Sequence, residues 1–162
     1  MLVEIRSTSA ALLLLAFGLG GCVSGRTPSP TNAATIGPAV AAPTIAAEQL
    51  VGRWGLAAYR DEKDIARSES EARSACGNPY EIGRGSSGGV VMHLADQAQP
   101  TELAVKGAAG GRNFIGPAAE PPGSPRDREI TSYTDRTFVA TWIDPAVATR
   151  YGTMIYVRCG AA

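Results

Sequence analysis

One short segment combines the residue types of a hydrolytic nucleophile. Residues 85–89 have the pattern Gly-x-Ser-x-Gly, with Ser87 at the centre, and His93 follows six residues later. Catalysis at such a serine requires a strand, a sharp turn and a helix, with an acid and then a histidine later in the chain. Residues 90–92 are Val-Val-Met, which predicts a strand instead. We therefore interpret the segment as a glycine-rich hairpin and expect neither catalytic residues nor enzymatic activity.

Acidic side chains concentrate between residues 61 and 71, a clustering that would suit a calcium ion if they formed a loop. Lysine and arginine residues interleave with them, and the glycine and loop length of an EF-hand are missing. We expect these acids to lie on the solvated face of a helix, and we expect no metal and no cofactor. The acids are Asp61, Glu62, Asp64, Glu69 and Glu71.

The start of the chain carries a pattern that concerns location. Residues 10–18 are apolar but too few to span a bilayer as a helix. The tetrapeptide Leu19-Gly20-Gly21-Cys22 follows, and its small residues suit a signal peptidase. This arrangement resembles bacterial lipoprotein signals, in which a small residue precedes an invariant cysteine that is acylated and becomes the mature N-terminus. An ordinary cleaved signal and a core cysteine are the alternatives.

The resemblance implies a membrane anchor of several acyl chains on Cys22, because a single chain holds a protein only weakly. Val23 is not the aspartate that retains lipoproteins at the inner membrane of enteric bacteria. We therefore expect a lipid-anchored protein of the outer membrane that faces the periplasm or the cell surface. The domain organisation predicted is a signal peptide over 1–21, a disordered tether rich in alanine and proline over 22–48, and a β-barrel domain over 49–162.

With Cys22 acylated, two cysteines remain, Cys76 and Cys159. An even pair in an oxidising compartment usually forms a disulfide, and a loop of roughly 80 residues would stabilise the fold by about 4 to 5 kcal/mol. If the helix runs back along the first strand, Cys76 returns to the end where that strand begins, and an antiparallel last strand brings Cys159 there. Two free buried thiols and a metal site are the alternatives, although a single histidine leaves zinc short of four ligands.

From residue 50, short segments rich in β-branched and aromatic residues recur between clusters of Gly, Pro, Asp and Ser. One segment, 62–75, is helical in pattern, with acidic residues in its first turn. The fold class predicted is all-β, a small antiparallel barrel of about eight strands with one helix after the first strand. Closure into a barrel removes exposed strand edges. Strands are expected at 51–59, 80–83, 90–94, 102–106, 112–115, 129–133, 137–143 and 152–159.

The first predicted strand opens with Gly52-x-Trp54. This motif resembles the opening of lipocalins and of small lipocalin-like barrels, among them secreted metalloprotease inhibitors and bacterial lipoproteins that carry an inhibitor barrel. The resemblance implies that Trp54 plugs the closed end and that an arginine near the last strand, here Arg158, stacks on it. In the inhibitors the disulfide closes a short early loop, whereas Cys76 and Cys159 lie far apart. Trp54 as a plain core residue is the alternative.

The side chains expected inside the barrel limit the kind of ligand that it can bind. Eight strands leave room only for side chains or one small ligand. A polar segment, 93–103, is a candidate recognition loop at the barrel mouth or an ordinary connection. Bulky residues are expected to face inward, namely Trp54, Leu56, Phe114, Phe138, Trp142, Met154 and Tyr156.

Charge excludes some partners. Lysine plus arginine and aspartate plus glutamate are both 15, a balance that points neither to nucleic acid nor to an anionic membrane surface. We expect a non-catalytic binding or interaction module of the cell envelope, with inhibitor-like or lipocalin-like character. Its partner would be an envelope protein or a small apolar ligand. The alternative is a structural outer-membrane component that contacts envelope proteins or peptidoglycan.

Overall fold

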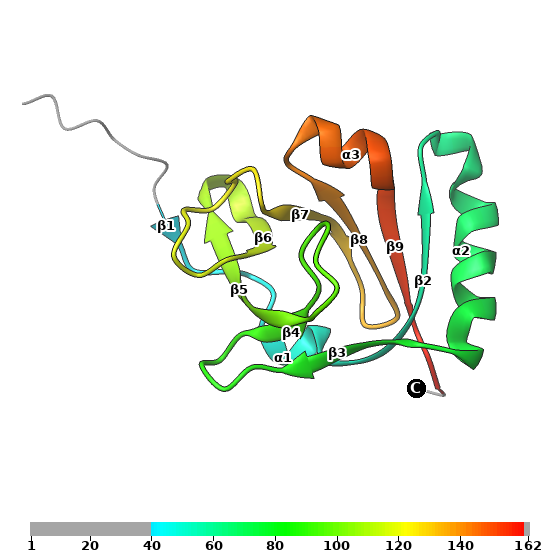
Figure 1. Cartoon of the computed structure of the whole chain (residues 1–162), viewed down its shortest axis with the longest axis horizontal. Helices are drawn as coiled ribbons and strands as arrows, with labels where there is room; N and C mark the ends of the chain where they lie inside the picture. The colour runs from blue at the N-terminus through cyan, green and yellow to red at the C-terminus, as the bar shows by residue number, and fades with distance from the viewer. Residues whose placement is uncertain (1–39, 161–162) are drawn as a thin grey trace, which may run out of the picture. The chain divides into compact units, whose positions relative to one another are not determined.

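The computed structural model describes residues 40–160, and their strands form an eight-stranded antiparallel barrel (Figure 1). The leader, Cys22 and the expected tether as far as residue 39 lie outside the described residues. The predicted barrel is confirmed, and the strand ends differ from the expected ones by one or two residues. The strands are β2 Gly52–Tyr59, β3 Tyr80–Arg84, β4 Val90–Met92, β5 Thr101–Ala108, β6 Arg112–Gly116, β7 Arg128–Tyr133, β8 Thr137–Trp142 and β9 Thr153–Arg158.

Three α-helices accompany these strands: α1 Ala47–Leu50, α2 Ile65–Ser74 and α3 Pro145–Tyr151. The predicted helix corresponds to α2 with short 3₁₀ turns at both ends. The structure adds two short helices, α1 and α3, to the one predicted after the first strand. α3 begins where Asp144 accepts hydrogen bonds from the backbone N–H groups of Ala146 and Val147, with proline at the first helical position.

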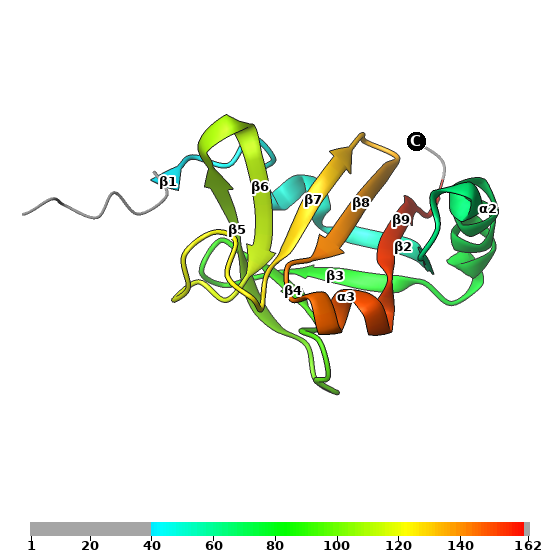
Figure 2. The same cartoon turned by 90° about the horizontal axis from the view of Figure 1, so that it is seen from above.

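Each strand of the barrel pairs with the next one in sequence, and the pairing of β2 with β9 closes the ring. β2 pairs with β9 from Trp54 to Tyr59 but with β3 only from Gly52 to Trp54. Figure 2 shows α3 and the loop after β4 at one end of the barrel, which we call the mouth. α1 and the β7–β8 hairpin lie at the other end, which we call the closed end.

α2 packs on the outside of the barrel against β2 and β9. Its buried Ala72 joins Ile155 and Val157 in a small apolar cluster separate from the barrel interior. Gly55 of β2 lies directly under the helix, where a Cβ atom would collide with the carbonyl oxygen of Ala72. A side chain at position 55 would therefore push the helix off the strand.

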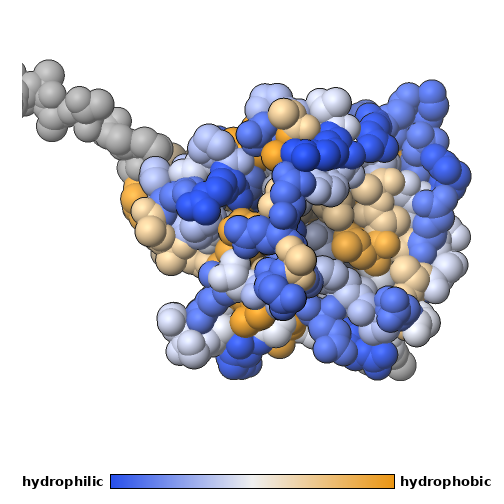
Figure 3. Space-filling view, viewed as in Figure 1, coloured by the Kyte–Doolittle hydropathy of each residue, from blue (hydrophilic) through white to orange (hydrophobic). Residues whose placement is uncertain are grey.

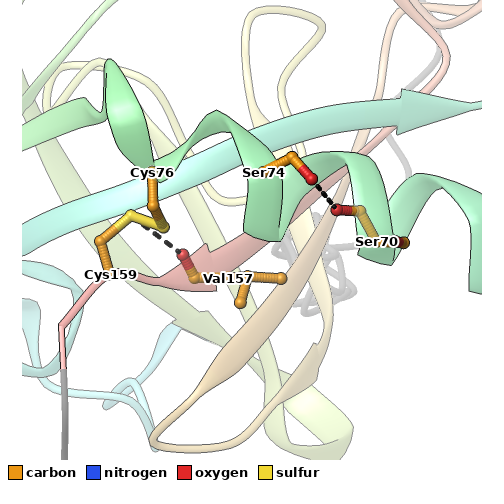
Figure 4. The surroundings of a disulfide bond; sticks show 5 residues. All are labelled: Ser70, Ser74, Cys76, Val157 and Cys159. Atoms are coloured by element: carbon orange, nitrogen blue, oxygen red, sulfur yellow. Dashed lines mark hydrogen bonds between the residues drawn. A yellow bond between two sulfur atoms is a disulfide. The ribbon is translucent and has the colours of Figure 1, made fainter.

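The predicted disulfide between Cys76 and Cys159 is confirmed, with the two Cα atoms 5.5 Å apart (Figure 4). It joins the 3₁₀ turn after α2 to the residue that follows β9. The backbone N–H of Cys159 also donates to the carbonyl oxygen of Arg53, 2.9 Å away, at the start of β2. The helix thus runs back to the beginning of its preceding strand, which is the arrangement under which the disulfide was expected.

The described part of the expected tether is folded onto the barrel, so the predicted boundary at residue 49 is too late. A two-residue strand, β1 Val40–Ala41, pairs with β5. The side-chain oxygen of Asn113 accepts from the backbone N–H groups of Thr44 and Ile45, at 2.8 and 3.2 Å. Composition does not predict this contact, because the group that satisfies the backbone of Thr44 and Ile45 is the buried side-chain amide of Asn113, far away in sequence.

The barrel interior is filled by aromatic and aliphatic side chains. Phe138 stacks on Tyr156 with ring centroids 4.1 Å apart, and Trp54 meets Phe138 edge-on at 4.8 Å. Leu56 and Met154 pack against the same core. Phe114 was expected there but occupies the other face of β6, since its neighbour Ile115 faces inward, and its ring lies against Gly123 of an outer loop.

Removal of the disulfide tests its contribution to stability. We expect the Cys76→Ala/Cys159→Ala variant to lose about 2 to 5 kcal/mol of unfolding free energy, because the cross-link restricts a long loop of the unfolded chain. Urea denaturation with and without reductant measures the loss. Reductant should lower the stability of the parent protein and leave the double variant unchanged; equal sensitivity of the two proteins would contradict the prediction.

Candidate functional site

At the closed end, Arg158 lies over Trp54, with its guanidinium carbon 4.1 Å from the ring centroid. The indole N–H of Trp54 donates to the carbonyl oxygen of Leu50 at 2.8 Å, and the ring is fully buried. Arg158 also donates to three carbonyl oxygens, those of Gln49, Val51 and Asp135. These contacts join α1 and the β7–β8 hairpin around the indole. They use one N–H group on each nitrogen of Arg158, so this residue has a structural role at the closed end.

The barrel is hollowed at the mouth. A depression of about 280 Å³ is lined by aromatic side chains of several strands together with residues 93–98 of the loop after β4. A larger depression of about 750 Å³ beside the disulfide includes Arg158 and Arg73, which already bind backbone carbonyls and Glu69 respectively. Figure 3 shows hydrophobic surface in small patches between hydrophilic segments on one face of the molecule. The mouth is therefore the stronger candidate.

Arg128, the first residue of β7, supplies a positive charge to the mouth. It lines the depression although only 3% of the residue is exposed. One terminal nitrogen donates to the hydroxyl of Tyr156 at 3.1 Å, and the other donates to the carbonyl oxygen of His93. Its guanidinium carbon lies 4.5 Å from the centroid of the Trp142 ring. Among the described residues, no carboxylate forms an ion pair with it.

Two buried donors of this group lack acceptors within the described part of the chain. They are Nε of Arg128 and the indole nitrogen Nε1 of Trp142. Buried donors without a partner are rare in folded proteins, because the lost hydrogen bond to water is not replaced. Burial also raises the pKa of Tyr156, and the nearby charge of Arg128 opposes that shift. The tyrosine therefore stays neutral and leaves the positive charge uncompensated.

The rim of the mouth is held by polar contacts. Asp96 accepts a hydrogen bond from the hydroxyl of Tyr151 and pairs with Arg150 at 3.0 Å, which ties the loop after β4 to α3. The bond to Asp96 raises the pKa of the Tyr151 phenol. Asp96 has a φ of 60°, an uncommon conformation for a residue other than glycine. Across the rim, Nδ1 of His93 lies 3.2 Å from the Tyr80 hydroxyl.

The Gly-x-Ser-x-Gly segment is a hairpin between β3 and β4, as predicted, and no helix follows it. The backbone N–H groups of Ser87 and Gly89 donate to the carboxylate of Glu102 at 2.8 and 3.0 Å. The Ser86 hydroxyl donates to the same carboxylate at 3.1 Å. His93 lies beyond the opposite end of β4. The structure therefore does not bring Ser87 and His93 together.

The acids of 61–71 lie along the exposed side of α2 and its preceding turn. Asp61 pairs with Lys63, Glu69 with Arg73, and Arg67 with an acid on either side. No cluster of three or more metal-ligating side chains occurs within residues 40–160. In that range, none of the helices has the length and apolar character needed to cross a membrane.

A second buried cation, Lys106 of β5, shows how this protein accommodates such a charge. Its ammonium group pairs with the fully buried Asp127 at 2.6 Å and donates to the carbonyl oxygens of Pro117 and Glu120. The other oxygen of Asp127 accepts from two backbone N–H groups of the outer loop. Lys106 is thus neutralised and fully bonded, whereas Arg128 is not.

Sequence reasoning missed Arg128, because the strand was expected to begin at Glu129. The available signal was alternation: Arg128 precedes Ile130 by two positions and therefore shares its inward face. The aromatic residues nearby were expected to face inward, and this charged residue was not. Trp142 was identified as inward-facing, but nothing in the sequence paired it with an arginine.

No protein family model matches the chain, and neither a curated protein nor a solved structure matches it. The molecule is thus defined by its own geometry as an eight-stranded antiparallel barrel with a plugged end and a hollowed mouth.

Glu102 makes the stability of the hairpin dependent on pH. Hydrogen bonds from Gly89, Ser87 and Ser86 lower its pKa below the ordinary value of 4.5. A lowered folded pKa contributes stability that is present above pH 4.5 and is lost as the pH falls through the folded pKa. We expect Glu102→Gln to destabilise the protein near neutral pH and to have no effect in strong acid. Urea titrations across this range measure the difference, and a constant difference would contradict the prediction.

Arg158 and Arg136 form a matched pair for testing the closed end. Arg158→Met keeps the apolar stem but removes the stack on Trp54 and three hydrogen bonds, so we expect a loss of about 1 to 3 kcal/mol of unfolding free energy. Arg136 is exposed, and we expect Arg136→Met to change stability by less than about 0.5 kcal/mol. Urea denaturation compares them, and equal effects of the two substitutions would refute a structural role for the stack.

Proposed function

We propose that this protein is a lipid-anchored, non-catalytic binding module of the bacterial outer membrane that engages its partner at the barrel mouth. The lipobox-like tetrapeptide ending in Cys22 supports the anchor. The disulfide supports an oxidising compartment, because such bonds persist mainly outside the cytoplasm. The anchor supplies the contact with the membrane, and the barrel supplies the recognition.

The observation that carries the proposal is the contrast between a filled interior and a hollowed mouth. Trp54, Phe138 and Tyr156 occupy the middle of the barrel in direct contact. A lipocalin-like carrier needs an internal cavity, and these rings occupy that space. The hollow of about 280 Å³ at the mouth has room for one or two side chains. A protein partner that inserts a short segment there fits better than an enclosed small apolar ligand.

The inhibitor-like variant of this role would require a segment that enters a protease cleft. Within residues 40–50, Val40 and Ala41 pair with β5, Thr44 and Ile45 donate to Asn113, and residues 47–50 form α1. These contacts hold the segment on the barrel, so it does not supply an arm that enters a protease cleft. We therefore place recognition at the mouth.

Photo-crosslinking in the native cells tests the site. A photoreactive amino acid replaces Ala98, which is exposed at the mouth, or Arg136, which is exposed at the closed end. We expect a discrete protein adduct from position 98 and none from position 136, in full-length protein that incorporates labelled palmitate. Cys22→Ala should abolish both the label and the adduct.

Two results would count against the proposal. Absence of palmitate label from the parent protein would refute the anchor. Adducts of equal yield from positions 98 and 136, or an adduct from position 136 alone, would refute recognition at the mouth and favour a structural envelope component that packs against its neighbours over its whole surface.

A further inference from the structure

We propose that the mouth binds a carboxylate attached to an apolar group, and that Arg128 and Trp142 hold the carboxylate. This inference rests on the proposed function, since it takes the mouth as the binding surface, and it names the chemistry recognised there. Its starting point is the pair of buried donors without acceptors among the described residues, Nε of Arg128 and Nε1 of Trp142.

The first argument is charge. A guanidinium group stays protonated at any physiological pH, so the energetic cost of burying its charge cannot be relieved by loss of a proton. A buried ion is costly unless it is paired and hydrogen-bonded. The described groups that contact Arg128 are neutral: a phenol, a carbonyl oxygen and an indole ring. The missing component is a negative charge.

A comparison within the same molecule strengthens this argument. Lys106 is the other cation with a buried environment, and the chain supplies it with Asp127 and several carbonyl oxygens. That pair pins the outer loop and faces away from the barrel interior. Arg128 lines a hollow instead. Its counter-charge can therefore come from a molecule that enters the hollow.

Asp96, the acid that lines this hollow, is already engaged. Asp96 accepts from Tyr151 and pairs with Arg150, both of α3, and forms no ion pair with Arg128. These bonds hold one wall of the hollow in place and leave the guanidinium available. An incoming carboxylate replaces no existing ion pair of Arg128.

The second argument is the pairing of donors and acceptors. A carboxylate accepts through two oxygens, and charge-assisted bonds from arginine are among the strongest in proteins. Arg128 and Trp142 are in contact, with the guanidinium carbon 4.5 Å from the ring centroid, and both side chains line the hollow. A neutral amide or alcohol supplies acceptors but not the charge. A carboxylate supplies both.

The third argument is the lining. Apolar and aromatic walls come from Leu56, Leu94, Tyr80 and Tyr151, and the polar part of the lining is His93, Asp96 and Gln97. The apolar walls favour an apolar group next to the carboxylate and disfavour a strongly hydrated anion such as phosphate. The C-terminal residue of a polypeptide and a free aromatic acid share this chemistry. The volume admits either one.

Nuclear magnetic resonance of the indole groups tests the proposal on the folded protein. The chain has two tryptophans, and the indole N–H of Trp54 already donates to Leu50 and serves as an internal reference. We expect N-acetyl-phenylalanine to move the Trp142 indole peak downfield and the Arg128 Nε–H peak with it. The Trp54 peak should stay in place. N-acetyl-phenylalaninamide should move none of them.

Two variants assign the effect to these side chains. Arg128→Met should weaken binding of N-acetyl-phenylalanine roughly ten-fold or more, as expected for loss of a charged hydrogen bond. Trp142→Phe keeps a ring under the guanidinium and removes only Nε1, so we expect a loss of about two- to ten-fold. Arg126→Met is the control, because Arg126 is a neighbouring exposed arginine that pairs with Glu120. It should leave the affinity unchanged.

The source of the carboxylate is resolved by a second pair of probes. A tetrapeptide that ends in phenylalanine with a free C-terminus should bind more tightly than N-acetyl-phenylalanine if the ligand is a chain end. If the single residue binds as well as the tetrapeptide, the ligand is a free acid. Amidation of the C-terminus should abolish binding of the tetrapeptide in both cases.

Three results would overturn the inference: no movement of the Trp142 peak with either carboxylate, equal movement with the amides, or equal movement with inorganic phosphate. These results are separable from failure of the proposed function. An adduct from position 98 that persists in Arg128→Met retains the mouth as a binding surface and refutes the carboxylate. Loss of that adduct in Arg128→Met, with Arg126→Met unaffected, supports both.

Discussion

The pairing of β2 with β9 is the interaction on which the rest of the structure depends. It closes the barrel from Trp54 opposite Arg158 to Tyr59 opposite Thr153. The same register puts the Arg158 guanidinium over the Trp54 ring and Cys159 beside Cys76. It also creates the outer surface that α2 covers. Because one ladder sets the plug, the disulfide and the helix position together, loss of its register would disturb all three.

The strands were predictable because alternation and turn chemistry are local, and the disulfide was predictable because few cysteines leave few pairings. Features that depend on contacts between residues far apart in the sequence were not predictable. The backbone near Ile45 is satisfied by Asn113, and Phe114 is buried by a loop near Gly123. The Arg128–Trp142 stack joins two strands through a contact that neither segment encodes alone. α3 differs, since Asp144 before a proline is a local helix signal that was overlooked.

The two buried cations, Lys106 and Arg128, differ in how the fold compensates the cost of burying their charge. Lys106 and Asp127 neutralise each other and fasten an outer loop to β5 and β6, so this pair has no net charge. Gly116 is small because Asp127 occupies the space that a side chain there would need. The described hydrogen-bond and stacking partners of Arg128 are neutral, and Arg128 lines a hollow. Under the inference drawn above, this difference is what makes Arg128, and not Lys106, the group that receives an anionic ligand.

The direction of the chain relates the mouth to the proposed anchor. β1 pairs with the last residues of β5, Gly107 and Ala108, next to the turn that leads into β6. That part of β5 is distant along the strand from Thr101, which follows the mouth loop. The N-terminal segment therefore joins the barrel away from the mouth. Among the described residues, β1 and the mouth loop thus lie toward opposite ends of β5.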